Sequence, residues 1–298
     1  QSPAAGRGFG VMCLAISVLA TAVLGRRAAG DWAVGGGLAL GWILFPPVLA
    51  IHSLNSPVAP ASALIAVALA ALWPGAKPAR GQDAFGAFAL AAAALVGPIG
   101  AWGTMVVVLM LLLMRPTLWT VLAPALGIGL ATAAIMGRDA GLALDPTWLP
   151  PERATVLLGA ILPFGMVWAG SALAAIVSRS TVTKYRLGLR PLRVCRAAPI
   201  VFAGLMWLAG RGQDAPGAAY LTVGAAFLPI SMVGIMPLVA WVRFGMPKTR
   251  SMAAWLAYPV VMYCCFWVVL EPIRRDTFPF GLVPDLSAPL AGRSAVVP

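Results

Sequence analysis

Charged side chains are scarce in this chain, and acids are scarcer than bases. Only 10% of its 298 residues are charged, and nine acids stand against twenty-one bases. Soluble domains typically carry about 25% charged residues, whereas 61% of this chain is hydrophobic and its mean hydropathy is +0.91. A water-soluble fold of this size could not cover so much apolar surface. The composition therefore predicts an all-α, polytopic integral membrane helical bundle.

The groups from which most metal centres are built are also scarce. The chain has a single histidine, His52, and its four cysteines form no C-x-x-C pair. One histidine cannot supply the H-E-x-x-H helix of intramembrane zinc proteases. Magnesium-dependent transferases cluster their acids, but here the acids are scattered among different loops. We therefore predict no cofactor and no metal site, and we favour a protein that is not an enzyme.

Acids are missing altogether from the long apolar runs. Proton pumps and cation-coupled carriers usually keep carboxylates near the membrane midplane. Their absence argues against a proton pump and against a metal carrier built from carboxylates. A Na⁺ site built from carbonyl and hydroxyl oxygens stays compatible with the sequence.

Apolar runs are what the chain has in quantity. A helix that crosses roughly 30 Å of hydrocarbon needs about 20 apolar residues. Ten runs, some of them short, predict ten spans: 9–25, 32–52, 58–74, 85–97, 100–114, 117–137, 155–177, 197–210, 219–242 and 252–270. They belong to one transmembrane domain over 1–298, and its last part, 271–298, is predicted to be an external tail. Two assignments are open, because 85–114 is either two short spans or one kinked helix, and 197–210 is short for a span.

The bases gather in loops that ten spans would place on one side of a membrane. With ten spans, fourteen of the twenty-one bases share one face, whereas fusing 85–114 would move Arg26 and Arg27 away from that face. The positive-inside rule therefore favours ten spans in a bacterial-type cytoplasmic (inner) membrane, with both termini outside. The largest basic group is predicted to anchor the topology and contact lipid headgroups, and it comprises Arg179, Lys184, Arg186, Arg190, Arg193 and Arg196.

The net charge of +12 would point to nucleic acid in a soluble domain. Here the bases lie at the ends of apolar runs, where they meet anionic lipid headgroups. We therefore predict membrane lipids as partners and no nucleic acid.

Prolines interrupt the apolar runs at corresponding places in the two halves of the chain. The second run holds a double proline, its counterpart the seventh run holds another proline, and the ninth run is broken as well. Five spans per half would make an inverted repeat, in which broken helices point to a binding site at the midplane. The predicted substrate site comprises Pro46, Pro47, His52, Pro163, Ser171, Pro229 and Ser231. For the histidine, the alternative is an interfacial ring at headgroup depth.

Taken together, these features predict a carrier or permease for a neutral, anionic or amphipathic small molecule. One alternative is a non-catalytic subunit of a larger membrane complex, which would dock protein partners on the basic loop 179–196 and the acidic loop 138–153. The other is a membrane-embedded transferase.

Overall fold

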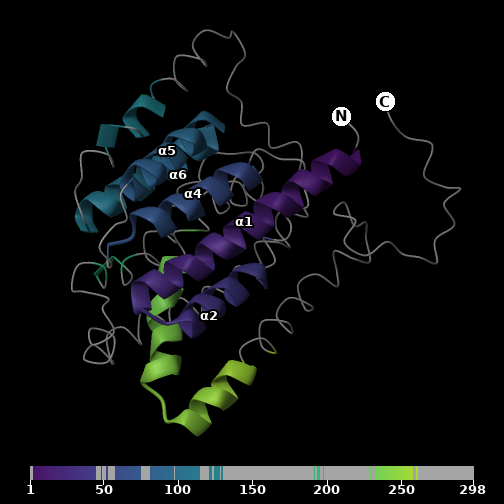
Figure 1. The fold of residues 1–298 in the computed structure, drawn as a ribbon, viewed down its shortest axis with the longest axis vertical. Helices are drawn as coiled ribbons and strands as arrows, with labels where there is room; N and C mark the ends of the chain where they lie inside the picture. Colours follow the sequence, from purple (N-terminus) through teal and green to yellow (C-terminus); the bar gives the residue numbers. More distant parts are fainter. Residues whose placement is uncertain are drawn as a thin grey trace, which may run out of the picture.

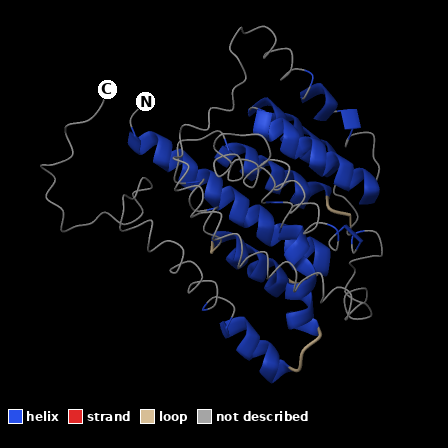
Figure 2. Cartoon of the chain, turned by 180° about the vertical axis from the view of Figure 1, so that it is seen from behind, coloured by secondary structure: helices blue, strands red, loops and turns tan. Residues whose placement is uncertain are grey.

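The computed structural model consists of α-helices and their connections over the residues it describes (Figures 1 and 2). These residues are 3–44, 48, 52, 58–74, 81–96, 98–114, 121–122, 124–127, 129, 191, 193–194, 197, 229, 232–257 and 260. The labelled helices are α1 (Pro3–Ala29), α2 (Trp32–Ile43), α4 (Val58–Leu72), α5 (Gln82–Val96) and α6 (Pro98–Met114). A further hairpin joins the helix Met232–Phe244 to a helix over 248–257, and we call it the 232–257 hairpin.

Helix length separates α1 from the other described helices. The segment Gly8–Ala29 is the one described helix that is long and apolar enough to cross a membrane, whereas α2, α4, α5 and Met232–Phe244 are shorter apolar helices. The 12 residues of α2 give a length of about 18 Å at 1.5 Å per residue. The prediction of an all-helical fold is confirmed for the described residues. The ten spans are not confirmed, because one helix alone has the required length.

The predicted run 32–52 is not a single helix. It begins after Asp31, whose extended backbone and side-chain oxygen form an N-cap on the Ala33 amide at 2.6 Å. It ends at Ile43, where the Leu44 amide donates to the Leu40 carbonyl at 3.0 Å. Pro46 lies two residues after Leu44 and is followed by Pro47. A residue that directly precedes a proline disfavours the helical conformation. The boundary at 52 is therefore wrong for this helix.

The ambiguous run 85–114 forms two helices, α5 and α6. A Cβ on Gly100 would meet the carbonyl oxygen of Ala93, and the Thr104 hydroxyl donates to the Leu90 carbonyl at 3.1 Å. Residue numbers rise on one helix as they fall on the other, so the two helices form an antiparallel hairpin. The alternative of one kinked helix is excluded.

Contacts along the helices fix their directions. Trp42 of α2 donates a hydrogen bond to Ser17 of α1, and Gly35 of α2 contacts Ala22 of α1. Residue numbers therefore rise on one helix as they fall on the other, and α2 runs antiparallel to α1. The α4 helix runs parallel to α1, because the carbonyl of His52, which precedes α4, abuts Gly10 near the start of α1.

The far ends of these helices meet in the same way. Arg27, near the end of α1, bonds to Ala70 and Ala71 near the end of α4. Gly86 of α5 packs on Leu72, so α5 starts where α4 ends and α6 returns to the same end.

The helix ends that meet here carry Arg26, Arg27, Arg243, Lys248 and Arg250, and we call this end the basic end. The 232–257 hairpin turns there as well, because Arg243 pairs with Asp31. The opposite end is marked by Gly10, His52 and the break between α5 and α6. The described helices therefore alternate in direction between the basic end and the opposite end, where Arg7 near the start of α1 is a described base.

Three consecutive glycines let α2 pack between two partners. A Cβ on Gly35 would meet the carbonyl oxygen of Ala22 in α1, and a Cβ on Gly37 would meet the indole ring of Trp255 in the 232–257 hairpin. A Cβ on Gly36 would meet no heavy atom of another element within 4 Å. Side chains on either flanking glycine would force the helices apart.

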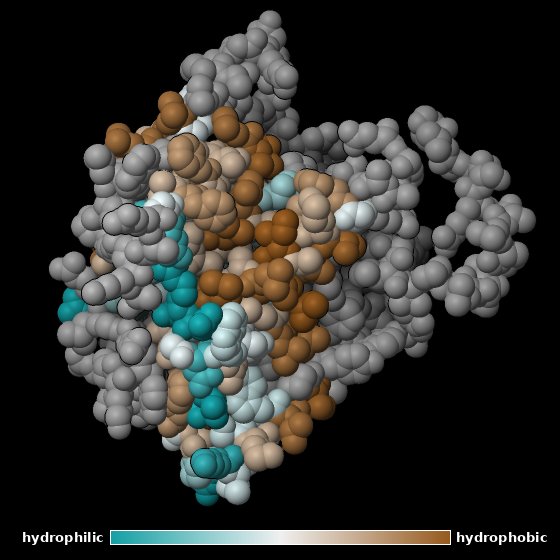
Figure 3. Space-filling model, viewed as in Figure 1, coloured by the Kyte–Doolittle hydropathy of each residue, from teal (hydrophilic) through white to brown (hydrophobic). Residues whose placement is uncertain are grey.

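Large apolar side chains cover the outside of α1, whereas smaller and polar ones face inward. The exposed residues lie three or four apart on one face: Phe9, Met12, Ile16, Leu19 and Val23. The buried face carries Cys13, Ser17, Ala20 and Thr21. Figure 3 shows hydrophobic atoms over the middle of the molecule and hydrophilic atoms toward the basic end. Small residues inside and large apolar residues outside are typical of helices that face lipid.

Candidate functional site

The imidazole of His52 lies inside the protein at the end opposite the basic end. It is 2% exposed and belongs to a helical turn with Val48, which is also buried. Its Nδ1 lies 2.7 Å from the Val48 carbonyl oxygen, and its backbone carbonyl abuts Gly10 of α1. The absence of a side chain at position 10 therefore allows α1 to approach the turn that carries the ring.

Two buried polar atoms of the described residues have no hydrogen-bond partner, and His52 Nε2 is one of them. The other is the Ser62 hydroxyl in α4. A buried polar group without a partner costs about 1–3 kcal/mol. In a membrane-embedded protein a buried ionisable residue is a candidate functional group by default.

Ser62 lies toward the same end of the bundle as His52. Its neighbour Ala61 is close to Gly100 at the start of α6, and α6 starts at the end opposite the basic end. Both unpartnered groups therefore occupy the same end, one before α4 and one in its first half.

The other buried polar groups between α1 and α2 are satisfied. The Trp42 indole donates to the Ser17 hydroxyl at 2.8 Å, and that hydroxyl donates to the Leu14 carbonyl at 2.8 Å. Thr21 donates to the Ser17 carbonyl at 2.7 Å. This chain of bonds joins two helices and leaves no group free for a ligand, so it is structural.

Arg27 closes the end of α4. Its guanidinium donates to the carbonyl oxygens of Ala70 and Ala71, each at 2.7 Å, and lies 3.5 Å from that of Trp73. The last carbonyls of a helix have no partner within it and carry partial negative charge. A cation from α1 therefore caps the neighbouring helix.

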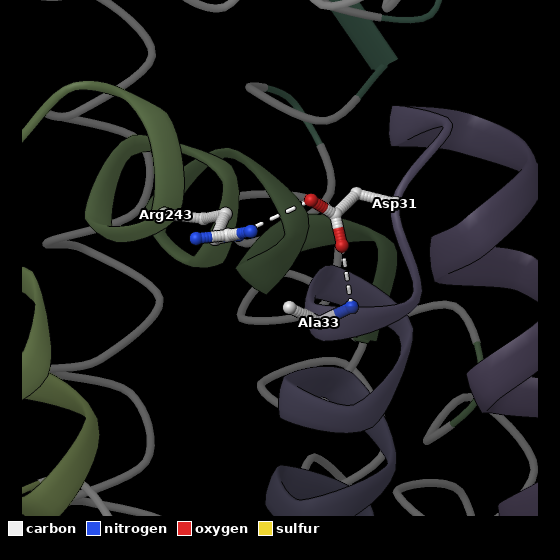
Figure 4. Close-up of polar contacts among 3 residues, drawn as sticks. All are labelled: Asp31, Ala33 and Arg243. Atoms are coloured by element: carbon white, nitrogen blue, oxygen red, sulfur yellow. Dashed lines mark hydrogen bonds and ion pairs between the residues drawn. The ribbon is translucent and has the colours of Figure 1, made fainter.

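Arg26 and Arg243 at the basic end also have partners within the chain. Arg26 lies over the ring of Trp32, 4.3 Å from its centroid. Arg243 bonds to Asp31 at 3.1 Å, while the second oxygen of that carboxylate caps α2 at Ala33 (Figure 4). Asp31 thus joins the start of α2 to the 232–257 hairpin.

Two of the seven predicted substrate-site residues are described. His52 is buried at one end of the bundle, and both of its interpretations, a substrate-binding group and an interfacial ring at headgroup depth, stay predictions. Pro229 is helical and buried, and no contact among the described residues joins it to His52. Outside the described residues lie Pro46, Pro47, Pro163, Ser171 and Ser231. The predicted substrate site therefore stays a prediction.

The predicted headgroup-binding loop is described at one of its six bases. Arg193 is helical and exposed. The others lie outside the described residues: Arg179, Lys184, Arg186, Arg190 and Arg196.

No metal centre is formed by the part of the chain that the structure describes, since no group of three or more His, Cys, Asp or Glu side chains comes together there. Cys13 is a free, buried thiol among apolar neighbours.

Sequence reasoning missed Ser62 and the partner of Arg27. A signal for the first was present, because Ser62 is the one hydroxyl in the run 58–74. No pattern in the sequence links Arg27 to carbonyls more than forty residues away.

Comparisons with known proteins do not place this chain in a family. No protein-family model matches it, and no curated protein or solved structure matches it either.

Proposed function

We propose that this chain is a multi-pass carrier of a bacterial-type cytoplasmic membrane, and that His52 belongs to its binding site. The buried and unpartnered Nε2 of His52 carries the proposal. A polar atom in this position becomes favourable when a small polar molecule binds to it. The proposed cargo is the class expected from the sequence, a neutral, anionic or amphipathic small molecule.

The membrane location is supported by the apolar exterior and by the basic end. The exposed face of α1 is apolar along its length, and α5 exposes Phe85 and Phe88 in the same way. Five described bases meet at the basic end of helices that alternate in direction, whereas Arg7 lies toward the opposite end, and this excess fits the positive-inside rule for a cytoplasmic face. We therefore place the basic end in the cytoplasm and His52 toward the outside.

Transport of small solutes by the purified full-length chain tests the proposal. Proteoliposomes would be exposed to gradients of glycerol, urea or acetate, and solute entry followed by light scattering. We expect at least one solute to enter faster than into liposomes without protein. His52→Leu should slow that entry about tenfold, since loss of one buried hydrogen bond is worth about 1.4 kcal/mol.

Gly36→Ala serves as the matched control, because a Cβ there meets no other atom within 4 Å, and it should transport like the wild type. Entry no faster than into empty liposomes for every solute, with folded protein present, would contradict the carrier proposal.

The second candidate is a subunit of a larger membrane complex, for which the apolar outer face of α1 would pack against another chain. Purification in mild detergent tests it. A companion protein in fixed stoichiometry, together with no transport by the isolated chain, would favour this function over the carrier.

A further inference from the structure

We infer that Nε2 of His52 is a hydrogen-bond acceptor that selects an uncharged solute bearing a hydroxyl or amide N–H donor, and that it disfavours carboxylates. This inference names the cargo class of the proposed carrier and rests on that function for transport, whereas the bonding state of the ring can be measured by itself.

The bond to Val48 fixes the hydrogen on the ring. A carbonyl oxygen can only accept, so Nδ1, at 2.7 Å from it, must donate. A neutral imidazole carries one N–H, and its second nitrogen then holds a lone pair. Nε2 is therefore the acceptor of the neutral ring.

The surroundings favour the neutral ring. The described acids are Asp31 and Asp83. Asp31 pairs with Arg243 at the basic end, and Asp83 lies in the first turn of α5, which starts at that same end. Neither provides a counter-ion for a ring at the opposite end, and a charged ring would bury a second N–H, on Nε2, that has no partner.

The lone pair determines which ligands fit. A hydroxyl or an amide N–H can donate to Nε2, whereas a carboxylate presents only acceptor oxygens and would place two lone pairs against each other. The Ser62 hydroxyl, the other unpartnered group at this end, can both donate and accept. A polyol or a small amide carries donors and acceptors suited to each group, whereas a carboxylate can accept from the hydroxyl and has no donor for Nε2.

Because His52 is the only histidine, ¹⁵N-histidine labelling of the full chain in lipid nanodiscs reports on this ring alone. We expect a protonated Nδ1 and a bare Nε2 at neutral pH. Glycerol or urea should shift the Nε2 signal, and acetate at the same concentration should not. A hydrogen on Nε2, a charged ring, or a shift caused by acetate and not by glycerol or urea would overturn the inference.

Flux through two variants provides the second test. His52→Gln retains an acceptor oxygen near the position of Nε2 and should keep more glycerol or urea flux than His52→Leu, which should lose about tenfold. Wild-type flux in His52→Leu overturns the inference and removes His52 from the proposed binding site, while transport itself still supports a carrier. An Nε2 signal that responds to glycerol, without transport of any solute, supports the inference and removes the carrier proposal.

Discussion

At the residue scale, the polar groups inside the bundle divide into those with partners and those without. Ser17 holds Trp42 across the interface between α1 and α2, whereas the Ser62 hydroxyl has no partner. The same residue type therefore has opposite consequences at two buried positions. The difference predicts opposite effects of the same substitution.

Ser17→Ala should lower the free energy of unfolding by about 1–3 kcal/mol, because it leaves the buried indole N–H of Trp42 without its acceptor. Ser62→Ala is the matched comparison and should raise the free energy of unfolding, because it removes a buried hydroxyl that has no partner. Thermal unfolding of the detergent-solubilised protein measures both. Equal losses in the two variants would contradict the assignment of Ser17 as the acceptor.

Arg27→Gln should also destabilise the protein, because the charged donor at the end of α4 is lost. Hydrogen bonds from a charged group contribute about 1.5–3 kcal/mol. Arg26→Gln removes a base of the same type from the adjacent position, where it lies over Trp32, and should cost about 0.5–1 kcal/mol. The two melting temperatures give the order, and a larger loss at position 26 would argue against the cap.

At the element scale, α2 depends on what its glycines exclude. Gly35 admits α1 and Gly37 admits the Trp255 ring, and these neighbouring positions point to different partners. Gly37 also begins a G-x-x-x-G pattern, a spacing typical of close helix packing. In the structure, Gly37 of this pattern packs against the 232–257 hairpin.

Gly35→Ala should reduce the yield of monodisperse protein in size-exclusion chromatography and lower its melting temperature, because the new Cβ would meet the Ala22 carbonyl oxygen. Gly36→Ala should be neutral or stabilising by up to about 1 kcal/mol, since alanine is the better helix former and the position is open. Identical behaviour of the two variants would show that α1 and α2 do not pack through Gly35.

The same elements show what the sequence could supply. The run 58–74 marks α4 closely, since an apolar run bounded by Pro and Gly clusters specifies a helix. The end of α2 at Ile43 agrees with the break expected at Pro46 and Pro47, although hydropathy alone, which continues across these prolines, does not mark it. The burial of His52 was unpredictable, because it depends on a contact with Gly10, more than forty residues earlier.

At the scale of the whole molecule, the distribution of bases and the helix directions agree. Five of the described bases meet at the basic end, and Arg7 lies toward the opposite end. Splitting 85–114 into two antiparallel helices preserves this arrangement, as the positive-inside rule favours. We therefore expect the turn of the 232–257 hairpin to face the cytoplasm and the predicted tail to lie outside.

Cysteine labelling tests this orientation in intact cells. In a chain without native cysteines, Ala291→Cys should react with a membrane-impermeant maleimide from outside. Thr249→Cys, at an exposed position of the basic end, should react only after permeabilisation. Labelling of position 249 in intact cells, with position 291 protected, would reverse the proposed topology.

The bonds from Arg27 to α4 also determine how the bundle can move. They tie α1 to α4 at the basic end, and we expect a tilt between these two helices to have its pivot there. Gly10 is seventeen residues from this pivot, a lever of about 25 Å, and a tilt of about 10° displaces it by about 4 Å. This displacement exceeds the diameter of a water molecule, which is about 2.8 Å for a radius of about 1.4 Å. A small rocking motion would therefore admit water to His52 from the far end while the basic end stays closed.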